Sequence, residues 1–206
     1  MNFQILIPAK PLTEGKSRLA PLLNGAYRAA LCEHLLRRIL VLGTATAPTT
    51  VVTADPRVAA IARSAGAHAL LEPANCGLNG ALDWARSQGG DVDCLLVMPI
   101  DLPWLSVAGL QSLRMNPRRI AIVTDRRGNG TNLLFLPRTA IRGFRFAFGQ
   151  DSAVAHQAEA ARLGISAETI SFAEAAFDID LPEDYTEYVF QRALNDGAAA
   201  QPPVDE

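Results

Sequence analysis

Residues 95–101 read Leu-Leu-Val-Met-Pro-Ile-Asp, an unbroken apolar run that ends in the carboxylate of Asp101. A continuous apolar run of this length is typical of a strand that is buried on both faces of a parallel sheet. Open α/β sheets bind their ligands beyond the carboxyl ends of such strands. The run therefore predicts an α/β fold in which Asp101 lies at the ligand-binding edge.

A second acidic segment, Phe-Asp-Ile-Asp at residues 177–180, also follows a strand-like stretch. Side chains of an extended chain repeat every second residue, so Asp178 and Asp180 are expected on one face. Three carboxylates at a sheet edge suit a hard, oxygen-seeking cation such as Mg²⁺, which itself binds phosphates. We therefore predict a metal site formed by Asp101, Asp178 and Asp180.

Around these segments, the apolar period switches repeatedly between that of a strand and that of a helix. Strands are expected at residues 3–7, 49–53, 67–71, 94–100, 120–123 and 132–136. Helices are expected at residues 26–42, 56–65, 79–87, 107–114, 152–163 and 183–194. This alternation predicts a mostly parallel sheet with helices on both faces. It gives one domain over residues 1–194, and the Ala- and Pro-rich stretch 195–206 is expected to be a disordered tail.

The composition excludes several classes of protein. The formal net charge of −2 provides no field for nucleic-acid binding. The three cysteines are scattered, which indicates neither a zinc cluster nor a disulfide framework. No apolar stretch is long enough to span a bilayer, and the N-terminus enters a strand without a signal peptide. The sequence therefore predicts a cytoplasmic globular protein without nucleic-acid or membrane partners.

The first loop concentrates positive charge. Lys10, Lys16 and Arg18 fall within nine residues, after the first expected strand. Such a loop at the ligand edge suits a triphosphate, although it is not a Walker loop because GxxxxGK[ST] is absent. The alternative interpretation is an exposed, solvated basic loop.

A set of short patches carries a family resemblance. The chain resembles the 2-phospho-L-lactate guanylyltransferase family of coenzyme F-420 (deazaflavin) biosynthesis from residue 5 to about residue 190. The matching patches, in the family's order, are residues 10–12 with 16–21, 77–79 with Ala81, 101–103, 125–131, 148–152 with His156, and 177–184.

The resemblance implies a Rossmann-related, GT-A-like nucleotidyltransferase fold. It also implies an enzyme that moves GMP from GTP to the phosphate of a three-carbon phospho-carboxylic acid and releases pyrophosphate. A preference for GTP over ATP, CTP and UTP rests on the resemblance alone. The implied partners are GTP, the small acid and a downstream deazaflavin transferase that receives the product. Whether the protein forms a homodimer is left open.

Residue by residue, the resemblance places further groups at the site. It implies nucleotide binding by Lys10, Lys16, Arg18, Gly77 and Asn79, and acceptor binding by Thr131, Gly149 and Ser152. The residue types also allow simpler roles, with Asn79 as the N-cap of its helix and Ser152 as the cap of the helix it begins. We expect His156 to play at most a supporting role at the site. Phe144, Phe146 and Phe148 alternate at the spacing of a strand, and we expect them to pack in the core and along the groove.

The implied transfer of GMP requires mainly that charged groups be correctly positioned around the two phosphate-bearing substrates. The nucleophile is an acceptor phosphate oxygen whose second pKa is about 6, so no general base is required. Repulsion between this dianion and a triphosphate opposes the reaction, and metal ions with cationic side chains on the leaving pyrophosphate overcome it. Lys16, Arg18 and Asp101 are the expected catalytic residues.

The acceptor is open among three acids known for the family: 2-phospho-L-lactate, phosphoenolpyruvate and 3-phospho-D-glycerate. The Arg-rich, Lys-poor composition suggests a GC-rich bacterium rather than a methanogenic archaeon, and this disfavours 2-phospho-L-lactate as the acceptor. Asn129, which stands where the family usually has Thr, adds an amide with donors and an acceptor. That amide favours 3-phospho-D-glycerate, whose extra hydroxyl it would satisfy.

Two other functions remain as alternatives. One is a nucleotidyltransferase of another type, such as a molybdenum-cofactor guanylyltransferase or a sugar-phosphate cytidylyltransferase. These usually have a glycine-rich first loop, whereas this chain has only Gly15 there. The other is a non-catalytic nucleotide-binding regulatory module, which would have no need for three strand-end aspartates.

Overall fold

The central sheet places apolar residues alternately on its two faces. The computed structural model describes residues 3–74, 76–113 and 116–199. In this part of the chain seven strands form one sheet of order β3-β2-β1-β4-β6-β5-β7. The strands are β1 (Phe3–Pro8), β2 (Thr49–Thr53), β3 (His68–Leu71), β4 (Cys94–Val97), β5 (Ile120–Thr124), β6 (Thr131–Pro137) and β7 (Ala167–Ile170).

Six of these strands are parallel to one another, and β6 runs antiparallel between β4 and β5. The expected mostly parallel sheet is therefore confirmed. The ladder between β1 and β4 ends at Val97, short of the expected Ile100, and Met98 N–H then donates to Leu6 O. The strand stops early because Pro99 has no amide hydrogen for a further ladder bond.

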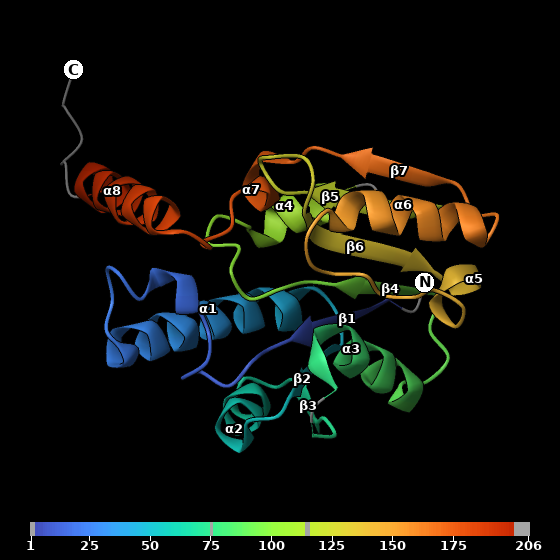
Figure 1. Cartoon of the computed structure of the whole chain (residues 1–206), viewed down its shortest axis with the longest axis horizontal. Coiled ribbons are helices and arrows are strands. Elements are labelled where there is room, and N and C mark those ends of the chain that lie inside the picture. The colour runs from blue at the N-terminus through green and yellow to red at the C-terminus, as the bar shows by residue number, and fades with distance from the viewer. Residues whose placement is uncertain (1–2, 75, 114–115, 200–206) are drawn as a thin grey trace.

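Helices cover both faces of the sheet (Figure 1). The described helices are α1 (Gly25–Thr46), α2 (Pro56–Ser64), α3 (Gly77–Gln88), α4 (Val107–Ser112), α5 (Arg138–Ile141), α6 (Ser152–Arg162), α7 (Ala173–Ala176), α8 (Pro182–Ala199) and the short 3₁₀ helix η1 (Ser17–Leu19). One core lies between the sheet and α1, α2, α4 and α7, where Ile5 and Ile7 are buried. The other lies under α3, α5 and α6, where Leu6 is buried.

Some elements differ from those expected. β7 was not expected, because its short sequence Ala-Glu-Thr-Ile is half exposed at the sheet edge. Residues 144–148 alternate like a strand but form none, and Phe144 and Phe146 pack as expected. α8 continues to Ala199, so residues 195–199 of the expected tail are helical, and residues 200–206 lie outside the described residues. None of the helices in the described part has the length and apolar character needed to cross a membrane.

Candidate functional site

The residues expected at a site belong to loops and to the first residues of helices and strands. β1 has β2 on one side and β4 on the other. Successive strands are therefore added to one side of β1 up to β3 and to its other side from β4 on, so the strand order reverses between β1 and β4. This is the switch point at which open α/β sheets bind ligands. Because β6 is antiparallel to β4, its first residue, Thr131, lies at the same edge of the sheet as the carboxyl end of β4, where the last ladder pair is Val97↔Leu134.

Lys16 is the centre of the charged cluster at this edge. Its Nζ donates to Asp101 Oδ2 at 2.5 Å and to Asp180 Oδ1 at 2.9 Å, and only 8% of its side chain is exposed. Burial lowers the pKa of Lys16, but Asp101 and Asp180 outweigh burial and raise this pKa above its ordinary value. Arg18 Nη1 lies 3.7 Å from the second oxygen of Asp180. The structure thus brings four of the predicted residues together.

Packing against α1 fixes the loop that carries Lys16. Leu19 is fully buried together with Leu35 of α1. Gly15 lies so close to α1 that a Cβ atom there would be 2.5 Å from Cys32 Sγ. Lys16 itself has a left-handed backbone with φ 54°, which is costly for a residue other than glycine. Packing on α1 therefore fixes the loop that positions the ammonium group, and Lys16 adopts a strained backbone conformation there.

The second acidic segment has the alternation that its sequence predicts. Phe177 and Ile179 are buried, whereas Asp178 and Asp180 are only half-buried. The segment is extended without being a strand in the sheet, and Ile179 N–H donates to Asp101 O at 3.3 Å. This bond joins the two acidic segments, and the shared contact with Lys16 brings the carboxylates of Asp101 and Asp180 together.

Asp184, on the first turn of α8, fixes the backbone of this segment by hydrogen bonds. Its Oδ2 accepts from the backbone N–H groups of Asp180 at 3.0 Å and Leu181 at 2.6 Å. Arg126 pairs with Asp184 and with Glu187, so its guanidinium is used within the fold. The sequence analysis did not single out Asp184. A carboxylate at the third residue of a helix is the signal that would have found it.

The two carboxylates of this segment differ in electrostatics. Burial, and then the charges of Asp101 and Asp180, raise the pKa of Asp178 to about 6, although Asn132 donates a hydrogen bond to it. Burial also acts to raise the pKa of Asp180, but Lys16 foremost, with Arg18 and Arg127, holds that pKa below its ordinary value. In the part of the chain that the structure describes, Asp178 forms no ion pair within 4 Å, and the charge of Lys16 only partly offsets the rise of its pKa.

The expected metal ligands fit a hard cation in the kind of atom that they offer, since Mg²⁺ takes carboxylate oxygens. Their arrangement differs from a preformed site. Among the described residues, no group of three His, Cys, Asp or Glu side chains is placed to hold a metal ion. Lys16 stands between Asp101 and Asp180, and the two carboxylates share its single positive charge.

The turn between β5 and β6 is organised by Asp125. Its Oδ1 accepts from the N–H groups of Asn129 at 3.1 Å and Gly130 at 3.0 Å, and Gly128 N–H donates to its carbonyl at 3.1 Å. Thr131 begins β6 directly after this turn. Asp125 was not among the predicted site residues, and its position before the Gly-Asn-Gly turn is the signal that indicates this role.

The start of α6 meets this turn, because Ala153 N–H donates to Asn129 O at 3.0 Å. Gly149 has φ +139° with open space around it, a conformation that favours glycine. The capping role considered for Ser152 is wrong. The N-cap is Asp151, which has a left-handed backbone, and Ser152 is the first helical residue and is buried.

Asn79 is likewise not an N-cap, because Cys76 holds that position of α3. Its amide pairs with the backbone of Phe148 instead: Nδ2 donates to Phe148 O at 3.1 Å, and Oδ1 accepts from Phe148 N at 2.8 Å. The pairing ties α3 to the loop of Gly149. Gly77 opens α3 with φ +62°, and Lys10 is exposed in the first loop. Both lie on segments that follow strands β3 and β1 at the carboxyl edge.

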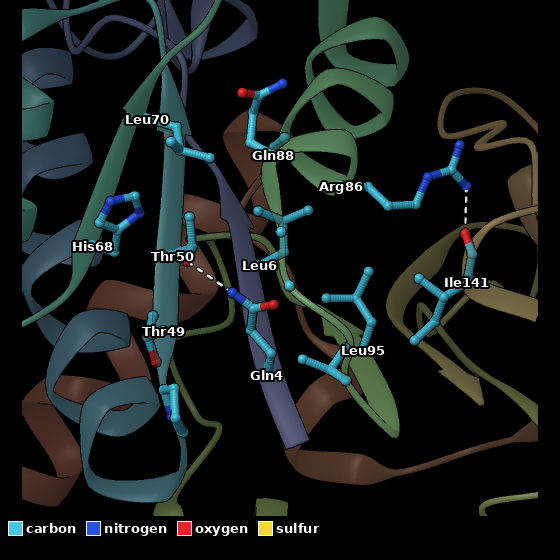
Figure 2. A pocket seen from close by; sticks show the side chains of 15 residues that line it. Gln4, Leu6, Thr49, Thr50, His68, Leu70, Arg86, Gln88, Leu95 and Ile141 are labelled. Atoms are coloured by element: carbon cyan, nitrogen blue, oxygen red, sulfur yellow. Dashed lines mark hydrogen bonds between the residues drawn. The ribbon is translucent and has the colours of Figure 1, made fainter. Parts of the chain in front are cut away.

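A cavity of about 280 Å³ lies elsewhere, at the amino ends of the strands (Figure 2). Gln4, Thr50 and Leu95 line it, and none of the predicted site residues does. Gln4 Nε2 donates to Thr50 Oγ1 at 3.0 Å, and Arg86 donates to Ile141 O at 2.8 Å. Gln4 and Arg86 thus have hydrogen-bond partners within the fold, and the charged cluster lies at the opposite edge of the sheet.

Solved structures of nucleotidyltransferases have the same architecture. A nucleotidyl transferase from Methanothermobacter thermautotroptrophicus superposes with a TM-score of 0.66 at 17% identity, over 93% of this chain and 98% of that one. A cytidylyltransferase from Leptospira borgpetersenii gives a TM-score of 0.56 at 12% identity over 100% of both chains. At these identities the likeness shows the fold alone, and it confirms the predicted nucleotidyltransferase fold.

Sequence comparison is more specific. A phosphoenolpyruvate guanylyltransferase of Sphaerobacter thermophilus is 35% identical over 190 residues, 88% of this chain and 90% of that protein. The protein of the same name from Rubrobacter xylanophilus is 35% identical over 192 residues, 89% of this chain and 92% of its own. The model of the family described as "Guanylyl transferase CofC like" matches residues 3–195. The chain therefore belongs to this guanylyltransferase family, and it is a nucleotidyltransferase enzyme.

Proposed function

We propose that the protein transfers GMP from GTP to the phosphate of a three-carbon phospho-carboxylic acid, as a step of coenzyme F-420 biosynthesis. The observation that carries the proposal is the cluster of Lys16, Asp101 and Asp180 at the switch point of the sheet. It sets a cation for the triphosphate beside carboxylates for a metal. The product would pass to a downstream deazaflavin transferase.

In the proposed reaction, an oxygen of the acceptor phosphate attacks the α-phosphorus of GTP. A new P–O bond forms, the bond from the α-phosphorus to the bridging oxygen breaks, and pyrophosphate leaves with that electron pair. The acceptor phosphate is mostly a dianion at neutral pH, so no side chain has to remove a proton. Lys16 and Arg18 carry the positive charge that the leaving pyrophosphate needs.

For Lys16, this role requires an exchange of partners. In the structure its ammonium bridges Asp101 and Asp180. A triphosphate offers stronger negative charge at the same edge, and we propose that Lys16 turns from the carboxylates to the phosphates. Asp101, Asp178 and Asp180 would then hold Mg²⁺, which when bound supplies charge neutralisation between the two phosphate groups.

Two acceptors compete in this proposal. The named relatives support phosphoenolpyruvate, since the proteins from Sphaerobacter and Rubrobacter are both called phosphoenolpyruvate guanylyltransferases. The exposed Asn129 favours 3-phospho-D-glycerate, because its amide suits the hydroxyl that phosphoenolpyruvate lacks. A site built around that hydroxyl would lose about 1–3 kcal/mol with an acceptor that lacks it.

Pyrophosphate release tests the nucleotide and the reaction type together. GTP, ATP, CTP and UTP are each supplied with Mg²⁺, with and without an equimolar mixture of the three acids. We expect release with GTP only, and only when the acids are present. Preference for CTP would point to a cytidylyltransferase, and nucleotide binding without any pyrophosphate would point to a regulatory module.

A further inference from the structure

His156 is a fully buried polar residue that the proposed reaction has not used. It lies on α6 with 0% of its surface exposed. Its Nδ1 is 3.0 Å from Thr131 Oγ1, and its Nε2 is 3.1 Å from the backbone nitrogen of Ala147. Both ring nitrogens are therefore engaged, and each contacts a different segment around the expected acceptor site.

These contacts fix the protonation of the ring. A backbone N–H can only donate, so Nε2 must be the nitrogen without hydrogen. In the neutral ring Nδ1 then carries the hydrogen and donates it to Thr131 Oγ1. The rings of Phe144 and Phe148 pack against His156 at 5.5 Å and 4.8 Å between centroids. Burial lowers the pKa of His156 to about 4, although the nearby Glu159 acts in the opposite direction.

The neutral ring in turn orients the hydroxyl of Thr131. Because Thr131 Oγ1 accepts a hydrogen from His156, its own hydrogen cannot point at that nitrogen. The hydroxyl is left as a donor for another partner at the start of β6, which lies at the carboxyl edge of the parallel strands. An anionic oxygen is the natural partner for a hydroxyl donor held in this way.

We infer that His156 is the positioning residue of the acceptor site: it holds Thr131 as a hydrogen-bond donor to an anionic oxygen of the phospho-carboxylic acid. The inference rests on the proposed function for the identity of that acid. It deepens the proposal because it explains how three separate segments are kept in one arrangement.

The three segments are those that carry the expected acceptor residues. Through Nδ1, His156 contacts Thr131 at the start of β6. Through Nε2, it anchors Ala147, which lies two residues before Gly149. Ser152 precedes His156 by four residues on α6, and residues with this spacing share a face of a helix. One imidazole ring therefore relates all three acceptor residues, which a histidine that only fills space in the core would not need to do.

Substitutions separate positioning from packing. His156→Leu keeps an apolar side chain in the core but removes both hydrogen bonds. His156→Gln supplies one acceptor and one donor and can reproduce the pattern. Val154→Ala, on the same helix with Val154 62% exposed, is the matched control. We expect His156→Leu to weaken acceptor binding roughly tenfold or more, as the loss of an oriented hydrogen bond to a charged group does.

The readouts are the KM of GTP, the KM of each acceptor, and acceptor binding by calorimetry. In His156→Leu the acceptor constants should rise, while the KM of GTP stays within about twofold. His156→Gln should recover most of the loss, and Val154→Ala should match the wild type. In a double-mutant cycle, His156→Leu should add little to Thr131→Val, because both changes remove the same donor.

A spectroscopic measurement covers the case in which His156→Leu does not fold. Nitrogen NMR of the wild-type ring should show a hydrogen on Nδ1 and none on Nε2 throughout pH 6–8. The opposite tautomer, unchanged acceptor affinity in a folded His156→Leu, or additive effects in the cycle would overturn the inference. Acceptor binding without transfer in the wild type would instead defeat the proposed function and leave the inference standing.

Discussion

At Lys16, one ammonium group separates two carboxylates that would otherwise repel each other. The pairs join residues 85 and 164 positions apart in the chain. The sequence analysis placed Lys16, Asp101 and Asp180 at the same edge, from the ends of strands and the basic loop. It could not show that they pair, because the contact depends on how the first loop packs on α1 and how the last acidic segment returns to the sheet.

We predict that Lys16→Met lowers turnover of GTP by roughly 10- to 150-fold, the range for loss of a hydrogen bond to a charged group. The same change should tighten Mg²⁺ binding in the absence of nucleotide, because the competing ammonium is gone. Steady-state kinetics and metal titration check the two effects. Lys16→Arg keeps the charge and serves as the control. Normal turnover in Lys16→Met would remove Lys16 from the mechanism.

The opposite pKa shifts of Asp178 and Asp180 predict opposite effects on stability. The pKa of Asp178 rises from 3.8 to about 6 on folding. The folded state therefore holds a proton that the unfolded state has released, and stability falls as pH rises through this window. Asp180 has a lowered pKa, so its ionisation stabilises the fold above its unfolded pKa of 3.8.

In a buffer without divalent cations at pH 7.5, Asp178→Asn should be more stable than the wild type by about 1–3 kcal/mol. Asp180→Asn should be less stable, since Lys16 loses a partner. The gain in Asp178→Asn should largely vanish at pH 3, where this carboxyl group of the wild type is protonated in both the folded and the unfolded state. The loss in Asp180→Asn should begin to shrink as pH falls below 3.8, because the unfolded wild type then gains the proton first. Urea unfolding at the two pH values measures this, and a destabilised Asp178→Asn at pH 7.5 would contradict the electrostatics. Because Asp178 and Asp180 are the proposed ligands of Mg²⁺, both variants should also lose nearly all turnover.

Among the elements, the first loop and α1 are in close contact at Gly15, which precedes Lys16 and lies against Cys32. We predict that Gly15→Ala destabilises the protein by about 1–3 kcal/mol, because its Cβ would lie 2.5 Å from Cys32 Sγ. Thermal unfolding and turnover should both recover in Gly15→Ala with Cys32→Ala, which removes the sulfur. A fully stable Gly15→Ala single variant would refute the steric account.

The elements differ in how far their sequences predicted them. Strands β1, β2, β4, β5 and β6 have strong apolar runs, and each was expected within a few residues. The direction of β6 was not, because a strand buried on both faces reads the same in either direction. β7 was missed because an exposed edge strand has no apolar run. The alternating Phe144, Phe146 and Phe148 form no strand, since no neighbouring strand pairs with them.

For the whole molecule, the sheet order explains why the site is where it is. The switch between β1 and β4 opens the carboxyl edge, and the antiparallel β6 brings Thr131 to that same edge. The sequence analysis predicted the edge and most of the charged residues. Capping was the alternative role left open for Asn79 and Ser152, and the structure does not support it, since Cys76 and Asp151 are the N-caps of these helices. The residue type alone could not decide this, because Asn and Ser are common both as N-caps and in the first turn of a helix.

The central claim is that this edge joins GMP to a phospho-carboxylic acid. The most direct measurement is mass spectrometry of one reaction that contains GTP, Mg²⁺, phosphoenolpyruvate, 3-phospho-D-glycerate and 2-phospho-L-lactate in equal amounts. We predict a product with the mass of one acid plus GMP less water, formed in step with pyrophosphate and nearly absent in Asp101→Asn. Pyrophosphate without any acid-linked guanylate, or an undiminished product from Asp101→Asn, would contradict it.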